Sequence, residues 1–287
     1  MRAAFEIIAR SQRDQLGEGP LWSQREHALF WVDILGRQVH RLSLRDRRVS
    51  SWTMPENIGW LIEREHQQGF IAGFASGFFE LGLEPLRTSL LCRPPLHPSS
   101  NRLNDAKADH HGRIWAGSMP FDADRPAGAL YRLDVAHKVT HVDGGYTVAN
   151  GPAFSRDGMF LYHTDSHARV VYRFRLHEDG SLSERTVFIE FPAEWGSPDG
   201  MTVDSDGGLW VAHWGGGRVS RFDERGKWER SIELPASRIT SCAFAGPELE
   251  RMFVTSAADG VPDEPHAGCL FEVDPGVRGL APHRYGG

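Results

Sequence analysis

The sequence predicts an all-β protein, a six-bladed β-propeller whose N-terminal strand closes the last blade. Short, apolar, β-rich segments recur with a spacing of roughly 40 to 49 residues, which is the period of propeller blades. No stretch carries a long apolar repeat of about 3.6 residues, so little helix is expected. Radial stacking lets each sheet bury its faces against its neighbours. We therefore expect residues 1–287 to form a single propeller domain.

Six segments have the composition of the second strand of successive blades. They are Leu29–Asp33, Phe70–Gly73, Ile114–Gly117, Phe160–His163, Leu209–Ala212 and Met252–Thr255. A third strand-like segment follows each one after a polar or glycine-containing turn. Gly112, Gly158 and Gly207 stand just before three of these second strands, where glycine can supply the positive φ of a tight hairpin.

The two ends of the chain are expected to complete one blade together. The last repeat, from Ile239 onward, lacks an outermost strand. The strand-like segment Phe5–Arg10 precedes the first repeat and has no blade of its own. We expect this segment to supply the missing strand and close the ring.

One position recurs in all six repeats, at the head of a short apolar segment, and carries an oxygen-bearing side chain in five of them. It is occupied by Glu18, Ile58, Asn104, Asn150, Asp199 and Ser241. Equivalent residues of a closed ring converge on its axis. Carboxylate and amide oxygens favour a hard divalent cation, so Glu18, Asn150 and Asp199, each beside a glycine, are candidate ligands. The alternative is that these side chains only satisfy backbone groups or water in the channel.

Composition narrows the classes of partner. The net charge is −6 and no basic cluster is present, which argues against nucleic acid. No apolar run approaches the length of about 18 residues that a membrane helix needs. The apolar part of the N-terminus is too short for a secretory signal, and the 3 cysteines form no CxxC motif. We expect a cytoplasmic protein with reduced thiols, either a monomer or a weak homo-oligomer.

Several motifs, taken together and in order, resemble the SMP-30/gluconolactonase family, which includes regucalcin and bacterial sugar-acid lactonases. They are LGEGPLW, RLNDAKAD with GRIWAGSM, VANGPAFS, SPDGMTVD, TSCAFAG and the C-terminal APHRYGG. The resemblance runs from about Gly17 to the end of the chain. It implies a six-bladed propeller with one divalent cation at the top of the channel, held by Glu18, Asn150 and Asp199.

The resemblance also implies which residues contact substrate. The family's Arg and Asn of an R-x-N-D segment fall on Arg102 and Asn104, and an acidic contact falls near Asp122, where regucalcin-like members carry Glu. The activity implied is metal-dependent hydrolysis of a sugar (aldono) lactone to the sugar acid. Asp199 is the candidate to orient or deprotonate the attacking water. Ca²⁺ is the first choice of cation, with Zn²⁺, Mn²⁺, Mg²⁺ and Fe²⁺ open.

Two other functions remain open from the sequence. One is a calcium- or small-ligand-binding propeller of the regucalcin type, and the other is a metal-dependent esterase of broader specificity. The polar pair Arg102 and Asn104 favours a sugar lactone, because a cation buffer needs no substrate contacts.

Overall fold

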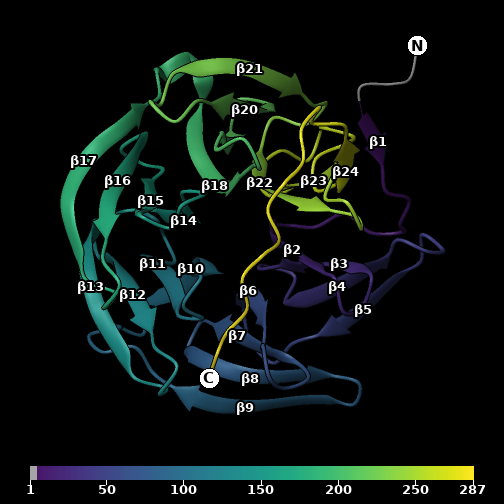
Figure 1. Ribbon diagram of the computed structural model, residues 1–287. Helices are drawn as coiled ribbons and strands as arrows, with labels where there is room; N and C mark the ends of the chain where they lie inside the picture. Colours follow the sequence, from purple (N-terminus) through teal and green to yellow (C-terminus); the bar gives the residue numbers. More distant parts are fainter. Residues whose placement is uncertain (1–4) are drawn as a thin grey trace.

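The computed structural model describes residues 5–287, and in these the chain forms six four-stranded antiparallel sheets around a central channel (Figure 1). The innermost strands are β2 (Gly17–Ser23), β6 (Ile58–Glu63), β10 (Asn101–Ala108), β14 (Ala149–Phe154), β18 (Ser197–Val203) and β22 (Ile239–Ala245). The six-bladed propeller predicted from the repeat is confirmed. The one helical element among the described residues is a 3₁₀ turn, Ala193–Trp195, and no helix there is long and apolar enough to cross a membrane.

The second strands fall where the apolar segments predicted them. They are β3 (Ala28–Asp33), β7 (Phe70–Phe74), β11 (Ile114–Pro120), β15 (Phe160–Asp165), β19 (Leu209–Trp214) and β23 (Arg251–Ser256). Gly112, Gly158 and Gly207 have φ of 74°, 70° and 85°, as the tight hairpins require. These strands are almost wholly buried because each lies between two neighbouring blades.

The third and outer strands complete the blades. The third strands are β4 (Gln38–Ser43), β8 (Gly77–Leu83), β12 (Gly128–Leu133), β16 (Val170–Leu176), β20 (Arg218–Phe222) and β24 (Phe271–Val273). The outer strands are β5 (Val49–Thr53), β9 (Leu86–Cys92), β13 (Val139–Tyr146), β17 (Leu182–Glu190), β21 (Trp228–Glu233) and β1 (Phe5–Ile7). Apolar side chains of adjacent blades pack together, as where Trp210 of one blade meets Phe244 of the next with ring centroids 6.4 Å apart. Full burial of a large apolar side chain contributes about 1.5–3 kcal/mol.

The last blade combines the two ends of the chain, as the sequence predicted. Strand β1 pairs with β24, with Phe5 opposite Val273 and Ile7 opposite Phe271. The ring of Phe5 also packs edge-on against Phe271 at 5.9 Å. The strand is shorter than the expected Phe5–Arg10, because the chain then turns toward the first blade.

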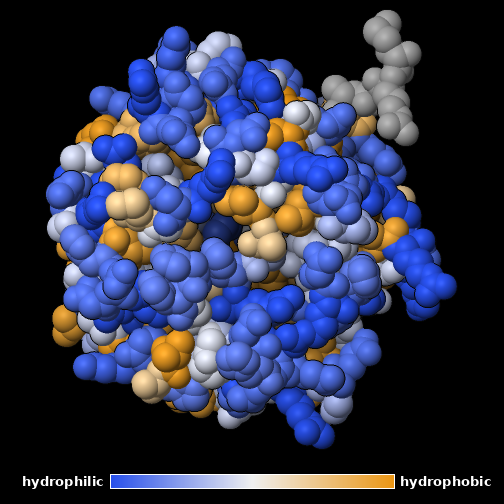
Figure 2. Space-filling view, in the orientation of Figure 1, coloured by the Kyte–Doolittle hydropathy of each residue, from blue (hydrophilic) through white to orange (hydrophobic). Residues whose placement is uncertain are grey.

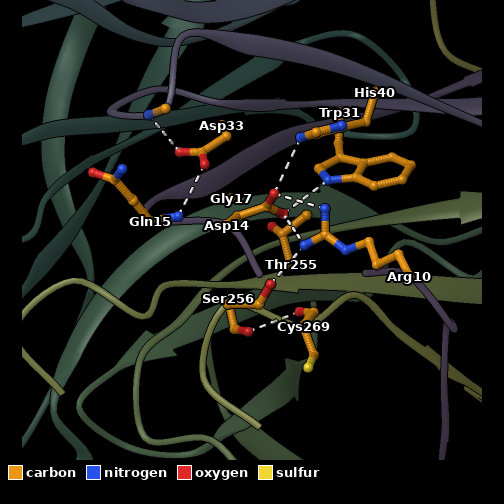
Figure 3. A network of polar contacts seen from close by, with 12 residues as sticks. Arg10, Asp14, Gln15, Gly17, Trp31, Asp33, His40, Thr255, Ser256 and Cys269 are labelled. Carbon is orange, nitrogen blue, oxygen red and sulfur yellow. Dashed lines mark hydrogen bonds and ion pairs between the residues drawn. The ribbon is translucent and has the colours of Figure 1, made fainter. Parts of the chain in front are cut away.

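A buried carboxylate, Asp14, fixes this turn between the last blade and the first (Figure 3). It accepts hydrogen bonds from Arg10 at 2.7 Å and from the Trp31 indole nitrogen at 2.9 Å, and His40 Nε2 lies 3.1 Å away. The Arg10 guanidinium also donates to the carbonyl of Gly268 in the last blade. Asp14 therefore joins side chains of β3 and β4 to the segment that follows β1.

The C-terminal segment crosses one end of the channel after β24 (Figure 1). Tyr285 is buried, its backbone pairs with Arg64, and its hydroxyl donates to the carbonyl of Asp134 at 2.8 Å. Arg284 lies 3.3 Å from the carboxylate of Glu63. The segment thus connects the last blade to the second and third blades.

The buried His163 on β15 makes stability depend on pH. It packs edge-on against Tyr146 at 4.6 Å, and burial, with a smaller effect of the Arg185 charge, lowers the pKa of His163 to about 3. The histidine pKa in an unfolded chain is about 6.5, so on acidification the unfolded state binds the proton first and stability is lost below about pH 6.5.

We expect His163→Phe to remove up to about 1.4 kcal/mol per pH unit from this acid-side slope of the unfolding free energy, measured by urea unfolding from about pH 7 to about pH 4. The exposed His66→Phe is the control, and equal slopes in wild type and His163→Phe would contradict the prediction.

Candidate functional site

A β-bulge falls at or beside the recurring polar position in every inner strand. Pairing with the second strand shifts between Glu18 and Leu21, Ile58 and Trp60, Leu103 and Ala106, Asn150 and Ala153, Pro198 and Met201, and Ile239 and Ser241. A bulge bends its strand and re-aims a side chain. Gly19 and Gly151, with φ of 54° and 70°, take up the left-handed conformation beside two of the polar residues.

Four of the six recurring positions meet in one cavity of about 290 Å³, at the end of the channel where the inner strands begin. Glu18, Asn104, Asn150 and Asp199 all line it, and so does Arg102. Ile58 and Ser241, at the two remaining positions, are buried and do not line it. The sequence proposed six site residues, and five of them, all but Asp122, therefore line this cavity.

Asp122 is the sixth candidate, and it lies outside this group. It is exposed in the loop after β11, and its neighbour Ala123 lines the cavity instead. Its contact with substrate stays a prediction.

A hydrogen-bond chain orients the two amides. Asn104 Nδ2 donates to Asn150 Oδ1 at 2.7 Å and to the Ala149 carbonyl at 2.8 Å, while Arg102 donates to Asn104 Oδ1. The Asn150 amide nitrogen donates to Ser166 Oγ at 2.9 Å. Because Ser166 occupies the donor side of Asn150, the amide oxygen is directed toward Asn104. Sequence reasoning missed Ser166, which lies on the loop after β15 and carries no motif of its own.

The two cavity carboxylates are destabilised as anions. Burial, followed by the charge of Asp105, raises the pKa of Glu18 to about 8. Burial, followed by the charges of Glu18 and Asp105, raises the pKa of Asp199 well above its usual range. The Arg102 guanidinium opposes both effects but does not cancel them. Neighbouring like charges out of contact with water have this effect on carboxyl groups.

A divalent cation fits these donors. Asp199 Oδ1 is buried without a hydrogen-bond partner, and Glu18 accepts only a backbone hydrogen bond, from Gly19 at 3.1 Å. Two carboxylates and one amide oxygen are hard ligands of the kind that Ca²⁺ and Mg²⁺ take. In residues 5–287 no three His, Cys, Asp or Glu side chains form a metal-binding cluster, and this cavity is no exception because its third donor is the amide of Asn150. The chemistry of Glu18, Asn150 and Asp199 therefore suits a hard divalent cation.

Two aspartates support the backbone that precedes two of these donors. Asp33 accepts hydrogen bonds from the amides of residues 15 and 16, at 2.9 and 3.0 Å, just before Glu18. Asp165 accepts from the amides of residues 147 and 148, at 3.2 and 3.3 Å, just before Asn150. Sequence reasoning missed this role, although both aspartates end a second strand and could have been found by aligning the repeats.

Arg102 and an apolar wall complete the cavity. Burial lowers the pKa of Arg102 to about 10, and the charges of Glu18 and Asp199 partly offset this, so the guanidinium is positive at neutral pH. Leu16, Met119, Val148 and Trp214 form the apolar part of the lining. The cavity thus offers a buried positive charge and two carboxylates beside an apolar surface, as in a site for a small polar molecule.

The fold and this cavity define a six-bladed propeller with an axial small-molecule site built from carboxylate and amide groups. The family model described as SMP-30/Gluconolactonase/LRE-like region matches residues 16–258. The chain belongs to this family.

Curated relatives match the chain over almost its whole length. A 6-deoxy-6-sulfogluconolactonase of Pseudomonas putida is 38% identical over 293 residues, covering 100% of both chains. A pentonolactonase of Haloferax volcanii is 36% identical and covers 92% of each chain. Regucalcin of Danio rerio is 34% identical and covers 96% of each chain.

Solved structures of the same kind superpose closely. A luciferin-regenerating enzyme gives a TM-score of 0.92 at 27% identity, covering 98% of this chain and 99% of that one. A calcium-binding regucalcin from Agrobacterium tumefaciens also gives 0.92 at 27% identity, covering 99% and 97%.

Proposed function

We propose that this protein is a divalent-metal-dependent lactonase that hydrolyses the ester ring of a sugar lactone to the free sugar acid. One observation carries the proposal: two buried carboxylates, of which Asp199 has an unpartnered oxygen, share a cavity with the polar pair Arg102 and Asn104. Two of the relatives named above are lactonases by name, which supports the same reaction class. A cation store would need the carboxylates but not the buried guanidinium.

Each residue of the cavity has a role in this reaction. Glu18, Asn150 and Asp199 would hold the cation, which when bound supplies Lewis acidity toward the lactone carbonyl and the attacking water. Arg102 and Asn104 would bind the ring oxygens and hydroxyls and orient the carbonyl. The apolar wall would exclude bulk water from the far side of the sugar.

Asp199 would act first as the general base and then as the general acid of the reaction. As water adds to the acyl carbon, the carboxylate accepts the water proton. The bond between the acyl carbon and the ring oxygen then breaks. Asp199 returns the proton to the departing alkoxide, so the product is a hydroxy acid and the carboxylate is regenerated. Ser166 acts on this step only by fixing Asn150, and Asn104 also fixes Asn150 in addition to its contact with substrate.

Metal removal tests the function. We expect protein treated with a chelator to lose lactone hydrolysis, and one of Ca²⁺, Mg²⁺, Mn²⁺, Zn²⁺ or Fe²⁺ to restore it. The substrates are glucono-, galactono-, xylono- and arabinono-lactones, with spontaneous hydrolysis subtracted. In Asn150→Ala, added metal should restore less lactone hydrolysis than in the wild type, while the hydrolysis rate of the metal-free protein should be unchanged. Cation binding without turnover on any lactone would favour a binding protein of the regucalcin type.

Replacing Arg102 by alanine is expected to weaken substrate binding more than catalysis. Loss of a charged hydrogen-bond donor of this kind costs about 1.5–3 kcal/mol, so KM should rise by about ten- to a hundred-fold. Steady-state kinetics on the preferred lactone measures the effect, with the exposed Arg125→Ala as control. An unchanged KM would remove Arg102 from the substrate site.

A further inference from the structure

The channel has a second cavity at its opposite end. This cavity, of about 300 Å³, lies where the inner strands finish, and the C-terminal residues Leu280 to His283 form part of its wall. On that face the surface is hollowed near the centre of the ring, with apolar side chains at the rim (Figure 2). None of Glu18, Asn150 and Asp199 lines it, so it is separate from the candidate active site.

The wall is mainly apolar and its residues come from all six inner strands. Large members are Trp22, Trp60, Ile62, Phe154, Phe244 and Leu280. Such a lining, with a few polar groups, is typical of small-molecule pockets. Its volume matches a compact organic molecule, since pockets of this class begin at about 300 Å³.

One lining residue, Lys107 on β10, brings a positive charge into this apolar surrounding. It is half-buried, and among residues 5–287 no carboxylate lies within ion-pair distance of its ammonium group. Asp105 and Glu18, further along the channel, are near enough for the Lys107 charge to lower the pKa of each, but burial outweighs this. The ammonium group therefore has no direct counter-ion.

The other charged side chains of the lining stand at the rim of the cavity, where they form hydrogen bonds with neighbouring groups. Asp157 accepts hydrogen bonds from Ser155 and from the amide of residue 159 in its own hairpin turn. Arg156 donates to the Ser205 carbonyl at 3.2 Å. His110 and His283 face each other at 6.3 Å, and burial lowers the pKa of both, so they add little charge at neutral pH.

We propose that this second cavity binds an amphipathic monoanion, a carboxylate or sulfonate carried on a compact apolar body. The acid group would pair with the Lys107 ammonium, and the apolar body would pack against Trp22, Trp60 and Leu280. A charge-assisted hydrogen bond in an apolar surrounding is stronger than one in water. The site does not depend on the proposed lactonase activity, because the two cavities share no lining residue.

Two ligands of one shape test the proposal on the full-length protein. 4-Phenylbutyrate carries the acid group, and 4-phenylbutanamide has the same body without the charge. In ligand-observed NMR titrations we expect the acid to bind at least about ten-fold more tightly than the amide. Lys107→Met should abolish this preference, so that both ligands bind alike. The exposed Lys138→Met is the matched control and should keep it.

Two further variants locate the binding. Ala281→Trp, in the exposed C-terminal segment, fills the mouth of the second cavity and should weaken both ligands. Asn150→Ala, in the other cavity, should leave the binding of both unchanged. The proposal is overturned by equal affinities for acid and amide in the wild type, by no saturable binding of either at millimolar concentration, or by loss of acid binding in Asn150→Ala. The wild-type comparison decides the charge preference even if a Lys107 variant fails to fold.

Discussion

Replacing Asp199 with asparagine is expected to lower kcat/KM for the lactone by about a hundred- to ten-thousand-fold, the usual contribution of a general base. Asparagine keeps the shape of the side chain but cannot accept the water proton, and it is a weaker cation ligand. The measurement is initial-rate kinetics at saturating metal, with spontaneous hydrolysis subtracted. The exposed Asp46→Asn serves as the control. Substantial turnover in Asp199→Asn would refute the catalytic role.

The same substitution is expected to make the metal-free protein more stable. Burial and the charges of Glu18 and Asp105 raise the pKa of Asp199 well above its usual range. A carboxyl group with a raised folded-state pKa takes stability away as the pH rises above its ordinary value of about 4. Asparagine removes that cost, so thermal unfolding without metal should move to higher temperature, and more so at neutral than at acid pH. An unchanged or lower Tm of Asp199→Asn at neutral pH would contradict the destabilisation by the ionised Asp199 carboxylate.

Replacing Asp14 with alanine is expected to destabilise the fold by about 3–5 kcal/mol, the cost of removing one partner from a buried ion pair. The change leaves Arg10, the Trp31 indole N–H and His40 without their shared acceptor. Burial alone would raise the pKa of Asp14, but His40 and Arg10 outweigh it and hold the pKa below its usual range. The stabilisation from this group is therefore present at neutral pH and lost as the pH falls below about 4. Urea unfolding at neutral and acid pH measures both effects.

A matched control exists in the fifth blade. Asp204 accepts hydrogen bonds from the Trp210 indole at 2.7 Å and from Arg221, but all three belong to one blade. We expect both Asp14→Ala and Asp204→Ala to lower stability. Only Asp14→Ala should speed hydrogen exchange at the β1 and β24 amides, because Asp14, unlike Asp204, links the first blade to the last. A loss of less than about 1 kcal/mol in Asp14→Ala, against the expected cost of an unpaired buried ion, would show that Asp14 is not needed to close the ring.

The fold was predictable because each repeat has the same order of apolar strand segments and turns. The apolar segment that became β11 begins at Ile114 as expected, and β1 took the place left free beside β24. Strand ends were less well predicted, since the second strands continue into polar residues such as Asp165 that cap neighbouring backbone. Side-chain period alone does not reveal such caps.

The candidate site was predictable in residue type and only partly in geometry. Aligned repeats picked Glu18, Asn150 and Asp199, and these line one cavity. The bulges that turn them inward depend on backbone pairing, which no single repeat displays. Ser166 was missed because it reaches Asn150 across a hairpin. Asp105 was missed because its influence is electrostatic and comes from burial, a property of the folded ring rather than of its motif.

The pairing of β1 with β24 has a consequence for how the protein is made. Strand β1 leaves the ribosome before the other strands, whereas its partner β24 is the last of the strands to be translated. Throughout synthesis the growing propeller therefore presents open sheet edges, which can pair with other chains. The circle can be completed only after β24 has emerged from the ribosome. A nascent chain stalled before β24 would hold all three proposed cation ligands and still lack its complete final blade.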